Sequence, residues 1–337
     1  MRIRIIGSGR ISKALLVYFK KFGLEHEVGF LTDQSQVRSC DVLLGVLPGG
    51  LGEKSLKLAL RYGKDLVDLS DLDTDFYLQN KAAAEKKRIK VIPGCGFCPG
   101  LVNLILGREI AVNSAIKEIE VKAGSLSPKR FYFPFLWCFE DLVLEFLLPS
   151  WQKINGRKKN FPPFGGYREE IICGIPSETY YAQSGFENLT RDLKIPTFTY
   201  RNIRPLGFAH MFRYLHNYGM FEKEFLSVTK SLLERKTEDN LSFSEITIGI
   251  SRDTKICWQI KSFSGKNEKL NSMQKITALF TATMARMFLE GRIQGYGMLF
   301  CETIGKDEKL FNDVLRIMRN EGISITRTTN KVSLHTK

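Results

Sequence analysis

The amino-acid sequence predicts an α/β protein with a doubly wound parallel sheet, followed by a second, α+β domain with an antiparallel sheet. Over residues 2–100, short apolar runs alternate with amphipathic segments at helical spacing, which is typical of parallel strands joined by helices. After about residue 115, apolar residues recur at every second position, as in antiparallel strands. We therefore assign residues 1–115 to the first domain and residues 116–271 to the second, and we expect a C-terminal segment of about 272–337 to return to the first.

The first domain begins with a strand, a glycine turn and a helix. Residues 2–6 form the apolar strand, and residues 11–22 place apolar side chains at helical spacing before Gly23 ends the helix. The same alternation continues in a strand at 26–33, a strand at 40–50, a helix at 53–64, a strand at 64–71, a helix at 75–88 and a strand with its turn at 90–100.

The second domain is predicted from its period-two segments. These strands are expected at 115–125, 178–185, 198–204 and 244–265. Near residue 273 the pattern becomes helical again, and residues 273–291 are apolar or small almost all round, as in a largely buried helix.

Composition limits the classes of protein that fit. The formal net charge is +14, but the basic residues occur in short mixed clusters without nucleic-acid-binding motifs, so nucleic acid is not an expected partner. No stretch approaches the roughly 18 apolar residues of a membrane helix, and the first residues lack an apolar signal region. We expect a cytoplasmic protein with no membrane contact.

The seven cysteines do not suggest a disulfide framework, because their spacing is irregular and their number is odd. Cys95 and Cys98 form a C-x-x-C pair, but no second pair completes a tetrahedral metal site. Glycine and proline crowd the pair as in a tight turn. We therefore expect an inert loop and no metal.

The first turn, GSGRIS, has the position of a phosphate-binding turn of a Rossmann-type fold. Gly7 would supply the tight turn and Gly9 the close approach of backbone to a pyrophosphate, while Arg10 and Ile11 open the helix whose dipole faces the phosphate. The third position of the G-x-G-x-x-G pattern is Ser12, whose small side chain still allows the helix to pack on the strand. The strand–turn–helix context favours dinucleotide binding.

Asp33 bears on the choice of dinucleotide. An acidic residue at the end of the second strand can accept hydrogen bonds from ribose hydroxyls and would repel a 2′-phosphate. The alternatives are that Asp33 is an ordinary turn residue, or that Arg38 serves a 2′-phosphate. NAD is therefore favoured over NADP as the cofactor, without excluding NADP.

Several stretches together resemble the saccharopine dehydrogenase family, and lysine 6-dehydrogenases most of all. The similarity spans nearly the whole chain, and its most specific elements are G-x-x-P-G-L-x-N and Y-R-x-I-R-x-x-G. In chain order the similar segments are GSGRIS, VDLSDLD, KVIPGCGFCPGLVN, FLWCFEDLVLEFLLPSWQKINGR, QSG at 183–185, YRNIRPLG and TALFTATMARMFLEGRIQGYG.

The resemblance implies nicotinamide-dependent oxidation at a carbon that bears an amino group, or the reverse reduction, on a small amino-acid substrate. It also implies that the second domain shapes the substrate pocket and that the protein is a homodimer. Such a reaction needs a charge partner for the substrate zwitterion and a group that takes up a proton.

The chain departs from the family in three places. Residues 32–39 stand where the family usually carries another helix and strand, so the part of the cofactor site that would contact adenosine is smaller than usual. Phe208 replaces the histidine that usually follows the glycine of the Y-R-x-I-R-x-x-G element. Cys98 stands where saccharopine-forming members carry an aspartate. The cysteine favours a smaller substrate than saccharopine, and the other two departures leave open a nucleotide-binding pseudoenzyme. A reductase of the saccharopine or carboxynorspermidine type is a further alternative.

Candidate site residues lie at the expected carboxyl edge of the parallel sheet. Asp71 and Asp68 are the candidate catalytic carboxylates, which could hold an ammonium group or relay a proton, although Asp68 could equally cap a turn. Trp137 could wall the substrate pocket or pack in the core. The loops expected to border the cofactor contribute Pro48, Gly49, Gly96 and Asn103.

Arg204 is the candidate for the substrate carboxylate. The period-two pattern places Tyr200, Asn202 and Arg204 on one face of a strand, and Arg201 with Ile203 on the other. A guanidinium group binds a carboxylate through two parallel hydrogen bonds. The alternative is a surface arginine paired with a neighbouring carboxylate.

Overall fold

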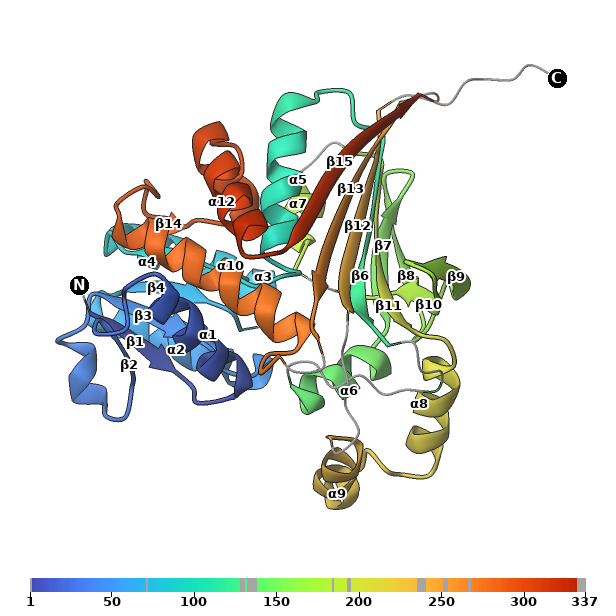
Figure 1. Ribbon diagram of the computed structural model, residues 1–337, viewed down its shortest axis with the longest axis horizontal. Coiled ribbons are helices and arrows are strands. Elements are labelled where there is room, and N and C mark those ends of the chain that lie inside the picture. The colour runs from blue at the N-terminus through green and yellow to red at the C-terminus, as the bar shows by residue number, and fades with distance from the viewer. Residues whose placement is uncertain are drawn as a thin grey trace. The chain divides into compact units, whose positions relative to one another are not determined.

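The computed structural model divides the chain into two compact units, which are described separately here (Figure 1). It describes residues 2–70, 72–127, 131, 138–183, 185–192, 195–234, 241–250, 254–265 and 268–331. Unit 1 consists of residues 1–114, 184–192 and 274–322. Unit 2 consists of residues 115–183, 193–273 and 323–337.

Unit 1 contains a six-stranded parallel sheet in the order β14-β5-β4-β3-β1-β2. Its central strand β3 is buried along its whole length, as its continuous apolar sequence predicts. The strands are β1 (Ile3–Ile6), β2 (Val28–Phe30), β3 (Val42–Gly45), β4 (Asp65–Asp68), β5 (Lys90–Ile92) and β14 (Gly297–Met298).

Helices connect these strands, as the alternating pattern predicts. The helix expected at 75–88 is broken in two at Asn80, whose side chain donates a hydrogen bond to the Phe76 carbonyl (2.8 Å). The helices are α1 (Arg10–Lys21), the 3-10 helix η1 (Gln34–Val37), α2 (Gly49–Tyr62), α3 (Thr74–Gln79), α4 (Lys81–Lys86), α5 (Leu101–Val112), α7 (Glu187–Asp192), α10 (Ser272–Leu289), α11 (Cys301–Ile304) and α12 (Glu308–Asn320).

The parallel sheet has fewer strands than usual on the side of β2. In the usual dinucleotide-binding order, two strands lie beyond the first strand on this side. Here β2 alone lies beyond β1 among the described residues, and η1 leads directly to β3. The reduced stretch at 32–39 thus removes one strand from the side that usually holds adenosine.

Unit 2 contains a nine-stranded sheet, which is mixed and not antiparallel as expected. β6 and β11 pair in parallel, because the chain between them leaves and re-enters the sheet through β7–β10. The main path is β15-β13-β12-β6-β11-β10-β9, and β7 links β8 to β11. The strands are β6 (Glu118–Leu126), β7 (Ser150–Ile154), β8 (Arg157–Phe161), β9 (Arg168–Ile172), β10 (Ile175–Tyr181), β11 (Thr197–Pro205), β12 (Leu241–Gly249), β13 (Thr254–Phe263) and β15 (Ser324–Lys331).

The C-terminal segment does not return to the first unit as a whole. Residues 274–322 belong to unit 1, but β15 pairs antiparallel with β13 over eight residues and so belongs to unit 2. The expectation that residues up to 337 join unit 1 was therefore wrong for β15. The reason is main-chain pairing with an open sheet edge, which the polar sequence of this strand does not reveal.

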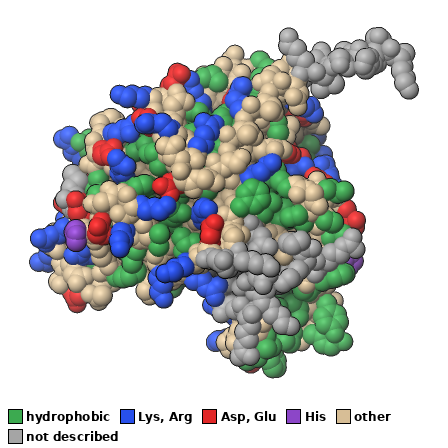
Figure 2. All heavy atoms as spheres, in the orientation of Figure 1, with side chains coloured by type: hydrophobic (Ala, Val, Ile, Leu, Met, Phe, Trp, Pro, Cys, Tyr) green, Lys and Arg blue, Asp and Glu red, His purple; other side chains and the backbone are tan. Residues whose placement is uncertain are grey.

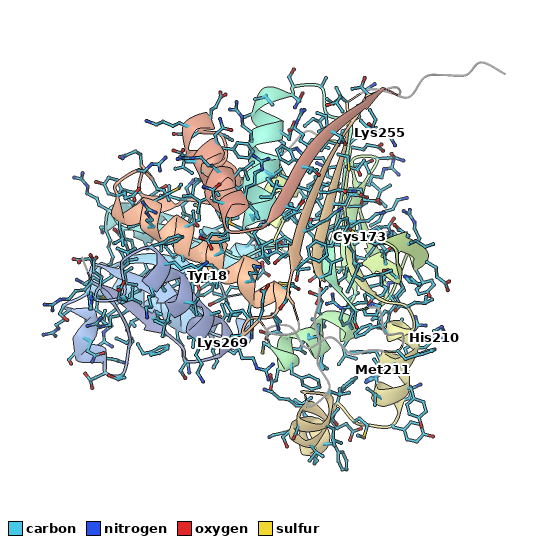
Figure 3. The ribbon with its side chains drawn as sticks, in the orientation of Figure 1. Tyr18, Cys173, His210, Met211, Lys255 and Lys269 are labelled. Carbon is cyan, nitrogen blue, oxygen red and sulfur yellow. The ribbon has the colours of Figure 1, made fainter. Side chains whose placement is uncertain are left out.

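Three helices of unit 2 enclose an aromatic core. They are α6 (Phe139–Leu147), α8 (Phe208–Asn217) and α9 (Lys223–Glu234). Figure 3 labels His210 and Met211 in the first turn of α8. The buried residues of this core are Phe139, Leu142, Val143, Phe146, Phe164, Tyr180, Phe208, Ala209 and Phe212.

The surface carries charges of both signs. Figure 2 shows Lys and Arg side chains spread over one face of the molecule, with Asp and Glu side chains among them. Among the described residues, no helix has both the length and the apolar character to cross a membrane.

In unit 1, α5 and α11 meet backbone to backbone. A Cβ atom on Gly107 of α5 would lie 1.9 Å from the Glu302 carbonyl oxygen, and one on Gly305 would lie 2.0 Å from the Leu104 carbonyl oxygen. Two glycines therefore bring helices that are about 200 residues apart in the chain into direct contact.

We expect Gly107→Ala to destabilise the protein, although alanine is the better helix former. The added methyl group would collide with backbone that cannot move without shifting α11, at a cost of about 1–3 kcal/mol. Thermal and urea unfolding measure the change. Gly50→Ala is the matched control, because a Cβ there meets no atom within 4 Å. Equal or greater stability of Gly107→Ala would contradict the expectation.

Candidate functional site

The first turn of unit 1 has the geometry of a phosphate-binding turn. Gly7 has φ +109° and lies against β3, where a Cβ would be 2.4 Å from the Val46 carbonyl oxygen. Gly9 has φ −71°, and a Cβ on it would meet no atom within 4 Å. Gly7 is thus required for the turn itself, whereas Gly9 leaves open space beside the backbone.

The N-terminal end of α1 is suited to bind an anionic group. Among the described residues, no side chain caps this end of the helix, and its first turn carries no acidic residue. Arg10 is exposed and Ile11 is half-buried at the first two helical positions. Ser12 is fully buried, which agrees with a packing role in place of the third glycine. The residues present therefore fit a dinucleotide pyrophosphate held by backbone N–H groups and the helix dipole.

A second glycine turn emerges at the same edge of the sheet, because β3 pairs in parallel with β1. Pro48 precedes α2 and Gly49 is its first residue, and this helix also has no side-chain cap. The predicted cofactor residues Pro48 and Gly49 thus follow the strand next to the GSGRIS turn.

Asp33 has a local role in the structure. It precedes η1, and its carboxylate accepts a hydrogen bond from the Ser35 backbone N–H (2.7 Å). Hydrogen bonds from Ser35 lower the pKa of this exposed carboxyl group. Asp33 is therefore a turn residue, as in the first alternative, and a contact of Asp33 with ribose remains a prediction.

Asp68 is fully buried at the end of β4. One carboxylate oxygen accepts hydrogen bonds from the Ser70 backbone N–H (3.0 Å) and hydroxyl (2.6 Å), and the other accepts one from the Tyr77 hydroxyl (2.9 Å). Burial raises the pKa of Asp68 to about 6, although these hydrogen bonds oppose the rise. Asp68 thus ties the loop after β4 to α3. The other candidate carboxylate, Asp71, lies outside the described residues.

Asn103 connects three segments of unit 1. Its Oδ1 atom accepts a hydrogen bond from the Gly100 backbone N–H (3.0 Å), and its Nδ2 atom donates to the Gly185 carbonyl (2.9 Å) and to Glu302 (3.3 Å). Gly96 pairs with Gly100 in the same loop. Both predicted cofactor residues thus lie in one loop, where the amide of Asn103 holds protein groups.

Sequence reasoning missed two carboxylates of unit 1, the buried Glu302 beside Asn103 and the half-buried Glu187. Glu302 also accepts a hydrogen bond from Asn188 (2.7 Å), and Glu187 accepts one from Thr74 (3.1 Å). Burial raises the pKa of both glutamates. Their partners are 113 to 199 residues away in the sequence, so no local pattern marks them.

The C-x-x-C pair shows no metal-binding arrangement. Cys95 is buried, and Cys98 is half-buried. Within the described ranges, no group of three or more His, Cys, Asp or Glu side chains is placed to hold a metal ion.

In unit 2, Arg204 is almost fully buried, with 1% of its surface exposed. The strand register places Tyr200, Asn202 and Arg204 on one face of β11, as predicted. The guanidinium group lies over the rings of Phe146 (5.1 Å) and Phe208 (5.7 Å). Phe208 is thus a core residue of α8. Trp137 lies outside the described residues.

We expect Asp68→Asn to remove a pH dependence of stability. A raised native pKa means that the folded state holds the proton more tightly, so the free energy of unfolding falls as pH rises from about 4 to about 6. The rise from 3.8 to about 6 corresponds to roughly 3 kcal/mol. Urea unfolding across this range measures it, with Glu53→Gln on the surface as control. A parallel pH profile for Asp68→Asn and wild type would refute the assignment.

A protein-family model matches this chain over more than half of its length. Residues 96–323 match the model of the saccharopine dehydrogenase C-terminal domain. The fold is similar to that of saccharopine dehydrogenase (L-Glu forming) from Saccharomyces cerevisiae, with a TM-score of 0.71 at 14% identity over 97% of this chain and 99% of that one. It is also similar to homospermidine synthase from Legionella pneumophila in complex with NAD, with a TM-score of 0.63 at 15% identity over 100% of this chain and 93% of that one. The chain belongs to the saccharopine dehydrogenase family.

Proposed function

We propose that this protein is an NAD(P)-dependent oxidoreductase that acts on the CH–NH2 or CH–NH group of an amino acid, in an oxidative deamination of the lysine 6-dehydrogenase type. The observation that carries the proposal is the GSGRIS turn, where Gly9 leaves open space at an uncapped helix start. The chain's family and its parallel sheet support it.

The cofactor side of the proposal rests on unit 1. A nicotinamide dinucleotide supplies the hydride acceptor or donor, so the protein has only to hold it, orient the substrate and move a proton. The backbone from Gly9 to Ser12 would hold the pyrophosphate, and Pro48 and Gly49 would border the next part of the cofactor. The open Gly9 and the uncapped starts of α1 and α2 support this assignment.

The substrate side of the proposal rests on Arg204 of unit 2 and on the carboxylates Asp68 and Asp71 of unit 1. Arg204 would bind the substrate carboxylate, with Trp137 as a wall of the pocket. Asp71 would take up the proton. Asp68, with a pKa of about 6, would exchange a proton near neutral pH or, through Ser70 and Tyr77, hold the end of β4 in position.

A second candidate is a nucleotide-binding protein without turnover. The absence of a strand beyond β2 in the described part of the sheet favours it, because adenosine would have less surface to contact. A reductase of the saccharopine or carboxynorspermidine type is the corresponding alternative among enzymes.

We expect Gly9→Val to abolish dinucleotide binding without unfolding the protein. The backbone angles of Gly9 are allowed for any residue and the space beside it is open, so the fold accepts the side chain, which then occupies the place of the phosphate. Calorimetric titration with NAD and NADP measures the loss, and Gly9→Ala should give an intermediate affinity. The proposed turn is wrong if the wild type binds neither dinucleotide, or if Gly9→Val binds as tightly as the wild type.

We expect NADH or NADPH to form when the protein is mixed with NAD or NADP and one amino acid of a panel that includes diamines. Alkaline pH should favour the reaction, because oxidative deamination releases protons and needs an uncharged amine. Absorbance of the reduced nicotinamide measures turnover. Tight nucleotide binding with no reduction of either cofactor by any member of the panel, and no oxidation of NADH or NADPH in reverse, would select the second candidate.

A further inference from the structure

The loop at residues 96–100, which follows β5, is in contact with a segment from a distant part of the chain. Residues 184–192 belong to unit 1, although the chain on both sides of them belongs to unit 2. Gly185 of this segment lies directly against Pro99, since a Cβ on Gly185 would be 2.4 Å from Pro99 Cβ. Glycine therefore allows the segment to lie closer to the loop than any other residue would.

A ring of hydrogen bonds joins this segment to α5 and α11. Asn103 of α5 donates one hydrogen bond to the Gly185 carbonyl (2.9 Å) and another to Glu302 Oε2 of α11 (3.3 Å). Asn188 of the segment donates to the other oxygen of this carboxyl group, Oε1, at 2.7 Å. Because Gly185 and Asn188 are three residues apart in one segment, the three contacts close the ring. Each of the three elements is thus held by the two others.

Asn103 has a fixed amide orientation in this ring. Its Oδ1 atom accepts a hydrogen bond from the Gly100 backbone N–H (3.0 Å), and its Nδ2 atom donates to the Gly185 carbonyl and to Glu302. If the amide turned over, its oxygen would face the carbonyl oxygen of Gly185 and its NH2 group would face the N–H of Gly100. The position of Asn103 therefore determines the position of Gly100, where the loop ends.

Glu302 is the charged member of the ring. It is 5% exposed, and burial raises its pKa although the hydrogen bonds from the two amides oppose the rise. A buried carboxyl group needs donors for both of its oxygen atoms, and Asn103 and Asn188 supply them. Because α11 meets α5 backbone to backbone at Gly107 and Gly305, Glu302 keeps its place beside Asn103.

We propose that Glu302 and Asn188 are positioning residues of the cofactor site. They act through Asn103 and Gly185, which together hold the loop at residues 96–100 at the carboxyl edge of the parallel sheet. The inference rests on the proposed function, because it takes the main chain of this loop to border the dinucleotide. A loop that is already held in one conformation binds a ligand without first losing conformational freedom, so its affinity for the ligand is higher.

The test exchanges the amide and the carboxylate of the ring. Asn188→Asp places two carboxylates face to face, which at about pH 8 repel each other and leave one pair of oxygen atoms without a proton donor. Adding Glu302→Gln to this variant restores one donor and one acceptor in reversed order, and the new amide still offers an oxygen atom to Asn103. The double variant should therefore recover what Asn188→Asp loses.

Two measurements on the full chain report on the loop. Backbone hydrogen exchange of residues 95–101, followed by mass spectrometry, should become tenfold or more faster in Asn188→Asp. The N–H of Gly96 donates to the Pro99 carbonyl (3.1 Å), a bond that opens when the loop moves. Calorimetric titration should show at least tenfold weaker binding of the dinucleotide. Exchange in β1 and α1 should stay unchanged, which a general loss of stability would not produce.

Each variant has a matched control. Asn113 also donates to a glutamate, Glu109 Oε2, at 2.8 Å, and it lies at the other end of α5, roughly 18 Å along the helix. Asn113→Asp should change neither measurement. Gly185→Ala tests the ring without a change of charge, because its methyl group would displace Pro99, and it should also speed exchange in the loop. Its control is Gly63→Ala, where φ is likewise positive but a Cβ meets no atom within 4 Å.

Unchanged loop exchange in both Asn188→Asp and Gly185→Ala would overturn the positioning role, and so would a double variant with Glu302→Gln that does not recover. If Asn188→Asp does not fold, Gly185→Ala and its control decide the question. Faster exchange in the loop with undiminished affinity for the dinucleotide would also overturn the inference. Failure of the proposed function is a separate outcome, recognised by a wild-type protein that binds neither NAD nor NADP.

Discussion

The requirement that buried polar groups be hydrogen-bonded shapes both units of this protein. In unit 1, Asp68 and Asn103 meet the requirement through contacts with other protein groups. Asp68 accepts three hydrogen bonds from Ser70 and Tyr77, and Asn103 holds Gly100, Gly185 and Glu302. These contacts fasten the loop after β4 to the following helix α3, and the helix after β5 to α11, which is distant in the sequence. The loops at the carboxyl edge of the parallel sheet therefore have fixed positions, which a cofactor site requires.

In unit 2 the same requirement is not met by the residues around Arg204. The guanidinium group keeps two N–H groups without hydrogen bonds among the described residues, although it is buried between aromatic rings. Asp68 and Asn103 of unit 1 have hydrogen-bond partners within the protein, which agrees with a role in positioning loops. Arg204 of unit 2 has two nitrogen atoms without such partners among the described residues, which agrees with its proposed role in binding a substrate.

Much of the candidate site could be predicted from the sequence where local geometry decides. The GSGRIS turn is an example, because strand, glycines and helix occur within about 20 residues and the conformations of Gly7 and Gly9 follow from that order. The common face of Tyr200, Asn202 and Arg204 follows from strand alternation. The role of Asp33 could not be decided in this way. Accepting a hydrogen bond from the turn and accepting one from a ribose hydroxyl both favour an acidic residue at this position.

The sequence by itself determined the parallel sheet of unit 1, the positions of its turns and the change of architecture near residue 115, because each depends on the spacing of neighbouring residues. Only the tertiary structure decided that β6 and β11 pair in parallel and that β15 joins the sheet of unit 2. It alone brought Glu302 to Asn103 and Glu145 to Arg204. These contacts join residues 59 to 199 positions apart, and such pairings are chosen by the packing of whole elements, which leaves no periodic signal in the chain.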